Sequence, residues 1–155
     1  MNYVRAFFGN YLLMSAAAGW FSAQIIKAFT GMFRERRFNF FVLLFSNGGM
    51  PSSHSAAVCS LCTASGIACG LGSPVFAVAA IFAMIVMNDA AGVRYETGEQ
   101  AKILNRITRE LFSGKPEESL DKTLKELVGH TPFQVFMGAI LGVLVAVLMA
   151  WLMIW

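Results

Sequence analysis

Two histidines are the residues of this chain best suited to acid–base and nucleophilic chemistry. His54 directly precedes one apolar run and His130 precedes another, so both stand where polar sequence meets a predicted membrane helix. An ionisable side chain at such a position is costly unless it is paired or solvated, which makes it a functional candidate. The simpler interpretation is a pair of interfacial side chains that reach toward water.

The segment around His54 predicts an anion site. Its sequence is Gly-Gly-Met-Pro-Ser-Ser-His-Ser over residues 48–55. Glycines and a proline bend the chain, serines then cap a helix, and the first-turn amides point outward at the positive end of the helix dipole. His54 in that first turn is placed to give a proton to an oxygen leaving phosphorus. The alternative is an ordinary capped helix start with a histidine at the membrane interface.

A second polar group follows the apolar run that begins at Pro74. Asp89 and Arg94 lie five residues apart in the sequence Asn-Asp-Ala-Ala-Gly-Val-Arg. The aspartate is able to hold a histidine in one tautomer or bind a cation, while the arginine grips phosphate with two hydrogen bonds. Equally, the two side chains form an ion pair that anchors the end of a helix.

The segment around His130 reads Gly-His-Thr-Pro-Phe-Gln over residues 129–134. Thr131 as N-cap, Pro132 at the first helical position and Gln134 three residues after the cap predict a capping box. The cap gives Gln134 a structural reason to be there. It gives His130 none, because His130 precedes the cap and is free to face the space above the helix ends.

The elements that position these residues are membrane helices. The composition is 57% hydrophobic and 14% charged, whereas about a quarter of the residues of a soluble domain are charged. About 20 apolar residues span a bilayer. Four segments are expected to do so, the fourth of them rich in small residues that suit close packing among other helices. They are Tyr11 to Phe33, Pro74 to about Gly92, Pro132 to Trp155, and Ser53 to Leu71.

The fold class is therefore all-α, a polytopic membrane bundle of about four spanning helices in one domain, residues 1–155. Residues 38–45 are apolar but too few to cross, which predicts a short re-entrant or interfacial piece. Residues 95–128 form a polar surface insertion whose leucines and isoleucines predict two amphipathic helices along the membrane surface, broken at residues 113–116. The spacings Gly66–Gly70 and Gly138–Gly142 predict packing sites that would also permit a homodimer.

Threading four spans through the bilayer gathers the polar residues on one side. That side holds residues 27–54 and 89–131 and every lysine and arginine except Arg5. Because positive residues favour the cytoplasm, we expect the polar site on the cytoplasmic face. The formal charge of only +3 gives no reason to expect a nucleic-acid partner. The three cysteines, Cys59, Cys62 and Cys69, lie together in one apolar run and are expected to be structural.

Three ordered motifs resemble a known family. The segment PSSHSA is similar to the PSGH signature of the type 2 phosphatidic acid phosphatases, which share a site with acid phosphatases and vanadium-dependent haloperoxidases. More closely, GGMPSSHSA, NDAAGVRYETGEQAKILN and GHTPFQV followed by GAILG resemble the divergent membrane branch of that superfamily. The resemblance runs from about Gln24 to Gly142.

The resemblance implies a phosphohistidine mechanism that needs no metal or other cofactor. It implies that His130 attacks phosphorus and that His54 protonates the leaving alkoxide. The phosphate-binding residues that it implies are Lys27, Arg34, Ser52 and Ser53. Glu35 stands where the family's first motif has proline, and Gln134 stands where its third motif has an aspartate that orients the histidine. No arginine closely precedes His130, and our hypothesis is that Arg94 and Asp89 replace the missing pair from an earlier helix.

The predicted function is hydrolysis of a lipid phosphate or pyrophosphate, of polyprenyl or diacylglycerol type. Two alternatives stay open. In the first, Asp89, Glu96 and Glu99 hold magnesium for transfer between a phospholipid and an alcohol, because carboxylates suit hard cations. In the second, the same cationic pocket binds or transports a phosphorylated lipid without catalysis. The expected partners are the bilayer and a lipid phosphate substrate.

Overall fold

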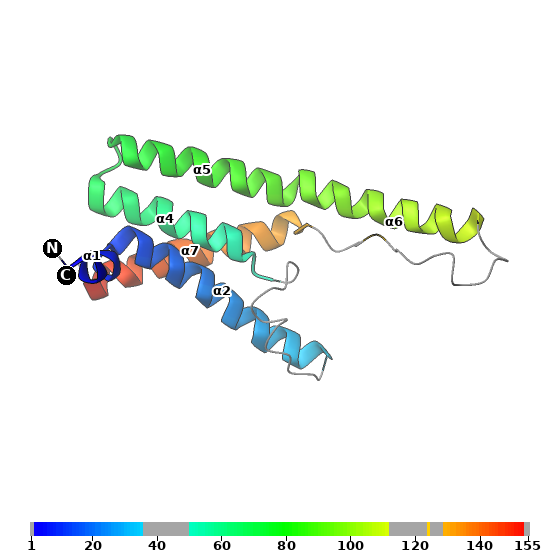
Figure 1. Ribbon diagram of the computed structural model, residues 1–155, viewed down its shortest axis with the longest axis horizontal. Coiled ribbons are helices and arrows are strands. Elements are labelled where there is room, and N and C mark those ends of the chain that lie inside the picture. The colour runs from blue at the N-terminus through cyan, green and yellow to red at the C-terminus, as the bar shows by residue number, and fades with distance from the viewer. Residues whose placement is uncertain (1, 36–49, 112–123, 125–128, 154–155) are drawn as a thin grey trace.

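The apolar runs of the sequence form the helices of a membrane bundle (Figure 1). A computed structural model describes residues 2–35, 50–111, 124 and 129–153, with the side chains of residues 31–35 and 111 left out. All regular structure in the described residues is helical. The helices are α1 (Tyr3–Phe8), α2 (Tyr11–Glu35), α4 (Ser53–Cys69), α5 (Pro74–Ala91), α6 (Val93–Leu111) and α7 (Pro132–Met153).

Three helical stretches are long and apolar enough to cross a bilayer. Among the described residues these are Tyr11–Thr30, Pro74–Glu110 and Pro132–Met153. They match three of the four expected spans, and the chain is a membrane protein. The expected fourth, α4, has 17 residues, which corresponds to a length of about 26 Å.

Small residues let α4 pack closely between α2, α5 and α7. A Cβ added at Gly142 of α7 would collide with the carbonyl oxygen of Ala56, and one at Gly138 would collide with that of Ser52. On the α2 side, the Ser60 hydroxyl donates a hydrogen bond to the carbonyl of Ser15 at 2.7 Å. The hydrophobic effect does not hold helices together within lipid. Close backbone packing and hydroxyl hydrogen bonds stabilise the contacts of α4 instead.

The predicted glycine spacings are only partly packing sites. Gly138 and Gly142 pack on α4, as expected, so both are already used inside the chain. Gly66 contacts the side chains of Leu71 and Phe76 beyond its own helix. The prediction for Gly70 is wrong: with nothing within 4 Å of an added Cβ and a φ of 84°, it ends α4 in the left-handed region that glycine tolerates.

One end of the bundle, called the polar end below, holds the end of α2 and the starts of α4 and α7 (Figure 1). Both termini and the α4–α5 turn lie at the opposite end. This arrangement agrees with the two sides predicted by threading four crossings. It places Lys27, His54, Asp89 and His130 in the same region of the molecule.

The α6 helix is amphipathic, as expected, but its direction differs from the prediction. It continues α5 almost in line and extends past the ends of α4 and α7 instead of turning onto the membrane surface (Figure 1). The reason is that the break is short: Gly92 N–H still donates to the carbonyl of Asn88, and the Gly92 carbonyl accepts from Glu96. Residues 38–45 and the second amphipathic segment, apart from Leu124, lie outside the described residues.

Candidate active site

The start of α4 forms the floor of the candidate site. Ser52 caps the helix, because its hydroxyl accepts from the Ser55 amide at 3.3 Å and its carbonyl accepts from the Ala56 amide at 3.0 Å. The amides of Ser53 and His54 therefore precede the first bond of the helical ladder and have no partner within it. They carry the positive end of the helix dipole, as the sequence predicts.

Lys27 of α2 brings a cation against this helix start. Its side chain is buried, with 8% exposed, and its Nζ donates to the Ser53 hydroxyl at 3.2 Å. Within the part of the chain that the structure describes, no carboxylate pairs with Lys27. Because a buried ammonium without a counter-ion is strongly unfavourable, this position favours an anionic ligand.

His130 is fixed by the capping box at the start of α7. The Thr131 hydroxyl accepts from the Gln134 amide at 3.4 Å, and the Thr131 amide donates to Gln134 Oε1 at 3.1 Å. The same Oε1 lies 3.2 Å from His130 Nδ1. Because the Thr131 amide is a donor, the Gln134 atom that it meets is the oxygen, and Nδ1 must then carry a proton. The lone pair of His130 is left on Nε2.

The break between α5 and α6 also positions His130. Where the helix is interrupted at Gly92, the carbonyl of Ala90 accepts a hydrogen bond from the His130 amide at 3.2 Å. Gly129 lies against the backbone of Arg94 and Tyr95 so closely that no Cβ fits there. The segment before α7 is therefore held between α7's own cap and the α5–α6 junction.

Burial favours the neutral form of His130. The residue is only 4% exposed and precedes the α7 span. Loss of solvation lowers its pKa below the ordinary value of 6.5, and the positive charge of Lys27 lowers it further, against a smaller opposing effect of the Gln134 hydrogen bond. A neutral imidazole with a free Nε2 is the form that acts as a nucleophile.

A pocket of about 250 Å³ lies above the α4 start, and both histidines line it. Its walls come from α4, α5, the beginning of α6 and the segment before α7. The lining residues are His54, Ile85, Val86, Asp89, Ala90, Arg94 and His130. Lys27, His54 and Arg94 all lie near enough to His130 for their positive charges to lower its pKa.

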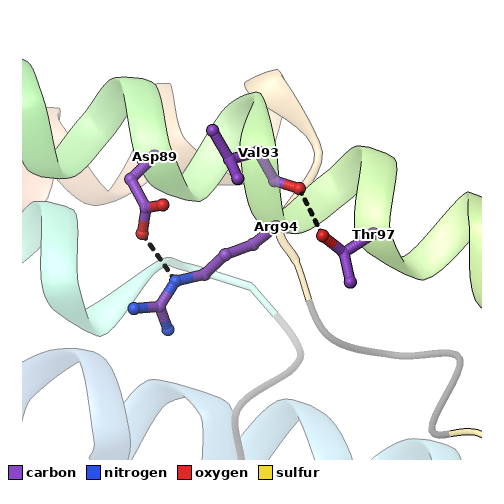
Figure 2. A network of polar contacts seen from close by, with 4 residues as sticks. All are labelled: Asp89, Val93, Arg94 and Thr97. Carbon is purple, nitrogen blue, oxygen red and sulfur yellow. Dashed lines mark hydrogen bonds and ion pairs between the residues drawn. The ribbon is translucent and has the colours of Figure 1, made fainter.

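Asp89 and Arg94 form an ion pair at the rim of this pocket (Figure 2). Arg94 Nε lies 2.6 Å from Asp89 Oδ2, and the two side chains are 52% and 41% exposed. Of the two interpretations of this motif, the ion pair is therefore observed. Both side chains also line the pocket with the histidines, so the pair is part of the same site.

The predicted site residues occupy three kinds of position. His54, His130, Asp89 and Arg94 line the pocket; Lys27 and Ser53 lie beside the start of α4; Ser52 and Gln134 form the caps that support it. The Ser52 hydroxyl is fully buried, and it bonds the Ser55 amide and hydroxyl. Arg34 lies on the last turns of α2, beyond the side chains that the structure describes.

Sequence reasoning missed four residues of the site. Ile85 and Val86 line the pocket from the apolar face of α5, Ala90 contributes a carbonyl, and Gly129 allows the close approach to α6. The glycine directly before His130 was the only local signal. The others depend on tertiary contacts that no spacing in the sequence reveals.

The fold and the pocket define a polytopic helical membrane protein with two histidines at the polar end of its bundle. The chain belongs to the divergent PAP2 family, whose model matches residues 8–145 and so confirms the resemblance drawn from the motifs. It is 42% identical over 140 residues to the uncharacterized membrane protein YuiD of Bacillus subtilis (strain 168), covering 84% of this chain and 88% of that protein. No solved structure matches the chain significantly.

Proposed function

We propose that the protein hydrolyses the phosphate or pyrophosphate ester of a membrane lipid through a phosphohistidine intermediate. The observation that carries the proposal is the buried Lys27 ammonium, which meets the start of α4 beside two histidines and has no carboxylate partner among the described residues. Membership of the divergent PAP2 family supports the same chemistry. The Lys27 ammonium and the first α4 amides, which have no partner within the helix, together suit a phosphate group.

In the proposed complex, positive groups surround the phosphate oxygens. Arg94 lines the pocket, and Lys27 and the amides of Ser53 and His54 lie beside it at the start of α4. Arg34 and the Ser53 hydroxyl complete the set carried over from the family, whereas the Ser52 hydroxyl serves the helix cap. These groups neutralise the charge that the equatorial oxygens carry in the transition state. Preorganised donors of this kind supply the largest part of many rate enhancements.

The reaction then proceeds in two balanced steps. His130 Nε2 attacks phosphorus, the ester P–O bond breaks, and His54 transfers its proton to the leaving alkoxide. Water next attacks the phosphohistidine, His54 accepts a proton from that water, the P–N bond breaks and inorganic phosphate leaves. Gln134 supports the first step because its Oε1 holds Nδ1 as the protonated nitrogen.

The apolar wall of the pocket favours a lipid substrate. Ile85 and Val86 belong to α5, so the wall is continuous with the surface of a membrane span. A phosphate at the polar end and a hydrocarbon tail along α5 fit this geometry. We further infer that α4 is the fourth crossing, because it carries the chain from the polar end back to the α4–α5 turn, and that the polar end faces the cytoplasm by its positive charge.

Phosphate release tests the proposal directly. Purified protein in detergent is assayed on polyprenyl and diacylglycerol phosphates and pyrophosphates, with and without chelator. We expect release that persists in chelator and falls with vanadate, which adopts the trigonal bipyramidal shape of the transition state. Absence of release over the whole panel, together with tight lipid binding, would instead assign the pocket to a non-catalytic binder.

The magnesium-dependent alternative has less support. Asp89 is paired with Arg94, and Glu99 with Lys102 at 2.6 Å. Within residues 2–30, 50–110 and 129–153, no group of three potential metal ligands is gathered. Activity that requires added magnesium and stops with chelator would favour this alternative over the phosphohistidine route.

A further inference from the structure

The Asp89–Arg94 ion pair depends on a break in the helix. Residues five apart in a regular α-helix are rotated by about 140° from each other and do not face one another. At Gly92 the backbone leaves the helical region, with φ −105° and ψ −90°, and α6 begins at the next residue. The break therefore returns Arg94 to the side of Asp89, and the two side chains meet at 2.6 Å.

The pair also lies in the wall of the pocket in which the phosphate is proposed to bind. Asp89 and Arg94 both line the pocket, together with His54 and His130. Only Nε of the guanidinium bonds the carboxylate, and its two terminal nitrogens lie away from Asp89 (Figure 2). The carboxylate thus holds one edge of the arginine as a substrate oxyanion would hold it.

We propose that Asp89 is an internal counter-ion of Arg94 that a tetrahedral oxyanion displaces when it binds. This inference rests on the proposed function, because the oxyanion is the phosphate of the substrate. The pair is half-exposed, and half-exposed ion pairs contribute little net stability, so its release is easy. A phosphate carries more charge than a carboxylate and takes two parallel hydrogen bonds from arginine, which favours the exchange.

Displacement would give Asp89 a second role. Asp89 and His54 line the same pocket. Once released from Arg94, the carboxylate is free to act as the counter-ion of a protonated His54, the form that donates a proton to the leaving oxygen. Phosphate binding would in this way prepare the acid on the other side of the pocket.

A double-mutant cycle on binding tests the proposal. Affinities for inorganic phosphate and for a short-chain lipid monophosphate are measured by titration calorimetry on the parent, Asp89→Asn, Arg94→Gln and the double variant. Removing the internal competitor in Asp89→Asn is expected to raise affinity by about two- to fivefold, the range set by exposed ion pairs. Arg94→Gln is expected to lower affinity, and adding Asp89→Asn to it is expected to give no gain.

The cycle separates competition between Asp89 and phosphate for Arg94 from the general effect of removing one negative charge. Glu110→Gln removes the same charge from another ion pair on α6, Arg106–Glu110 at 2.9 Å, and is expected to leave affinity unchanged. If Asp89→Asn gives no gain, or the same gain when Arg94 is absent, displacement is wrong. Should Arg94→Gln fail to fold, as judged by its thermal transition, Arg94→Lys serves in its place because lysine lacks the Nε edge that Asp89 holds.

The two ligands identify what displaces Asp89. A gain with both means that the phosphate group alone is sufficient, and a gain with the lipid alone means that the tail is needed to bring the phosphate to Arg94. Both results support displacement. Because binding is measured without turnover, failure of the cycle in a protein that releases phosphate would overturn this inference alone and leave the proposed hydrolysis intact.

Discussion

The α4–α7 contact and the α6 helix represent opposite ways of placing functional residues. Between α4 and α7, glycines lie directly on backbone carbonyls, so the two helix starts that carry His54 and His130 are held at a fixed separation. In contrast, α6 extends beyond the bundle and leaves Ile103, Leu104 and Ile107 exposed (Figure 1). The helix starts that carry the two histidines thus belong to the tightly packed region, whereas Arg94 lies at the start of α6 and its side chain is 52% exposed.

This difference suggests a division of work within the site. The proposed nucleophile, His130, must be held in one tautomer and one place, and two caps and a close helix contact provide that. A cation that exchanges its counter-ion for substrate needs freedom instead. His130 connects the two regions. Its backbone amide donates a hydrogen bond to the carbonyl of Ala90 at the end of α5.

The largest effect is expected from removing either of the two histidines that the packed helix starts carry. His130→Ala deletes the proposed nucleophile and His54→Ala deletes the proposed acid, and each is expected to reduce phosphate release at least about a hundredfold, since a positioned acid or base contributes about that much or more. Initial rates of phosphate release on the best lipid substrate measure this. Unchanged thermal transitions show that the variants are folded, and a rate equal to that of the parent in either would contradict the mechanism.

The next largest effect is expected on stability, where substitutions in the two regions should differ in the free energy of unfolding that they remove. Gly142→Ala drives a Cβ into the carbonyl of Ala56, and forced packing of this kind costs about 1–3 kcal/mol. Leu104→Ser on α6 removes a side chain that is already 50% exposed and should change the free energy of unfolding by about 0.5 kcal/mol or less. Thermal unfolding in detergent compares them, and an equal or larger loss for Leu104→Ser would contradict the contrast drawn here.

The pH dependence of activity tests the Gln134 contact. In the proposed mechanism neutral His130 is the reactive form, and its lowered pKa would extend the active range to pH values below the ordinary histidine value of 6.5. In Gln134→Glu a negative charge beside Nδ1 favours the imidazolium, so the acidic limb should move to higher pH. Profiles of kcat/KM against pH for both proteins measure the acidic limb. A limb that stays in place or moves to lower pH would contradict the proposed role of Gln134.

The smallest effect on turnover is expected on α6, at Asn105. Its side-chain amide makes two hydrogen bonds of 2.9 Å with the backbone of Leu124, one to the carbonyl and one from the N–H. Asn105→Ala should lower the free energy of unfolding by about 1–3 kcal/mol, from two bonds worth about 0.5–1.5 kcal/mol each, with little change in turnover. Denaturation and phosphate release together check this. A collapse of turnover with unchanged stability would place Asn105 in the site.

Local signals were sufficient for much of the site. Ser52 and the Thr131–Gln134 capping box are predictable because caps depend on residues three apart in sequence, and both are found as expected. The contact between Ala90 and His130 is not predictable, since it depends on where the α5–α6 junction meets the segment before α7. Gly70 was misjudged because a small-residue spacing looks the same whether a glycine packs or ends a helix.

The Asp89–Arg94 motif was only partly predictable from the sequence. A spacing of five predicts no contact in a continuous helix, so the choice between ion pair and separate ligands depended on how sharply Gly92 breaks the chain. The direction of α6 was mispredicted for the same reason. Amphipathic periodicity gives the face of a helix, but the angle at a junction is set by a few backbone hydrogen bonds.

Trapping the intermediate tests the central claim most directly. The protein is mixed with lipid phosphate, quenched rapidly under alkaline conditions that preserve N-linked phosphate, digested, and analysed by mass spectrometry. Phosphate on His130 is the predicted result, with no such label in His130→Ala. Turnover of the substrate with His130 unmodified at every time point, or with the label on another residue, would contradict it.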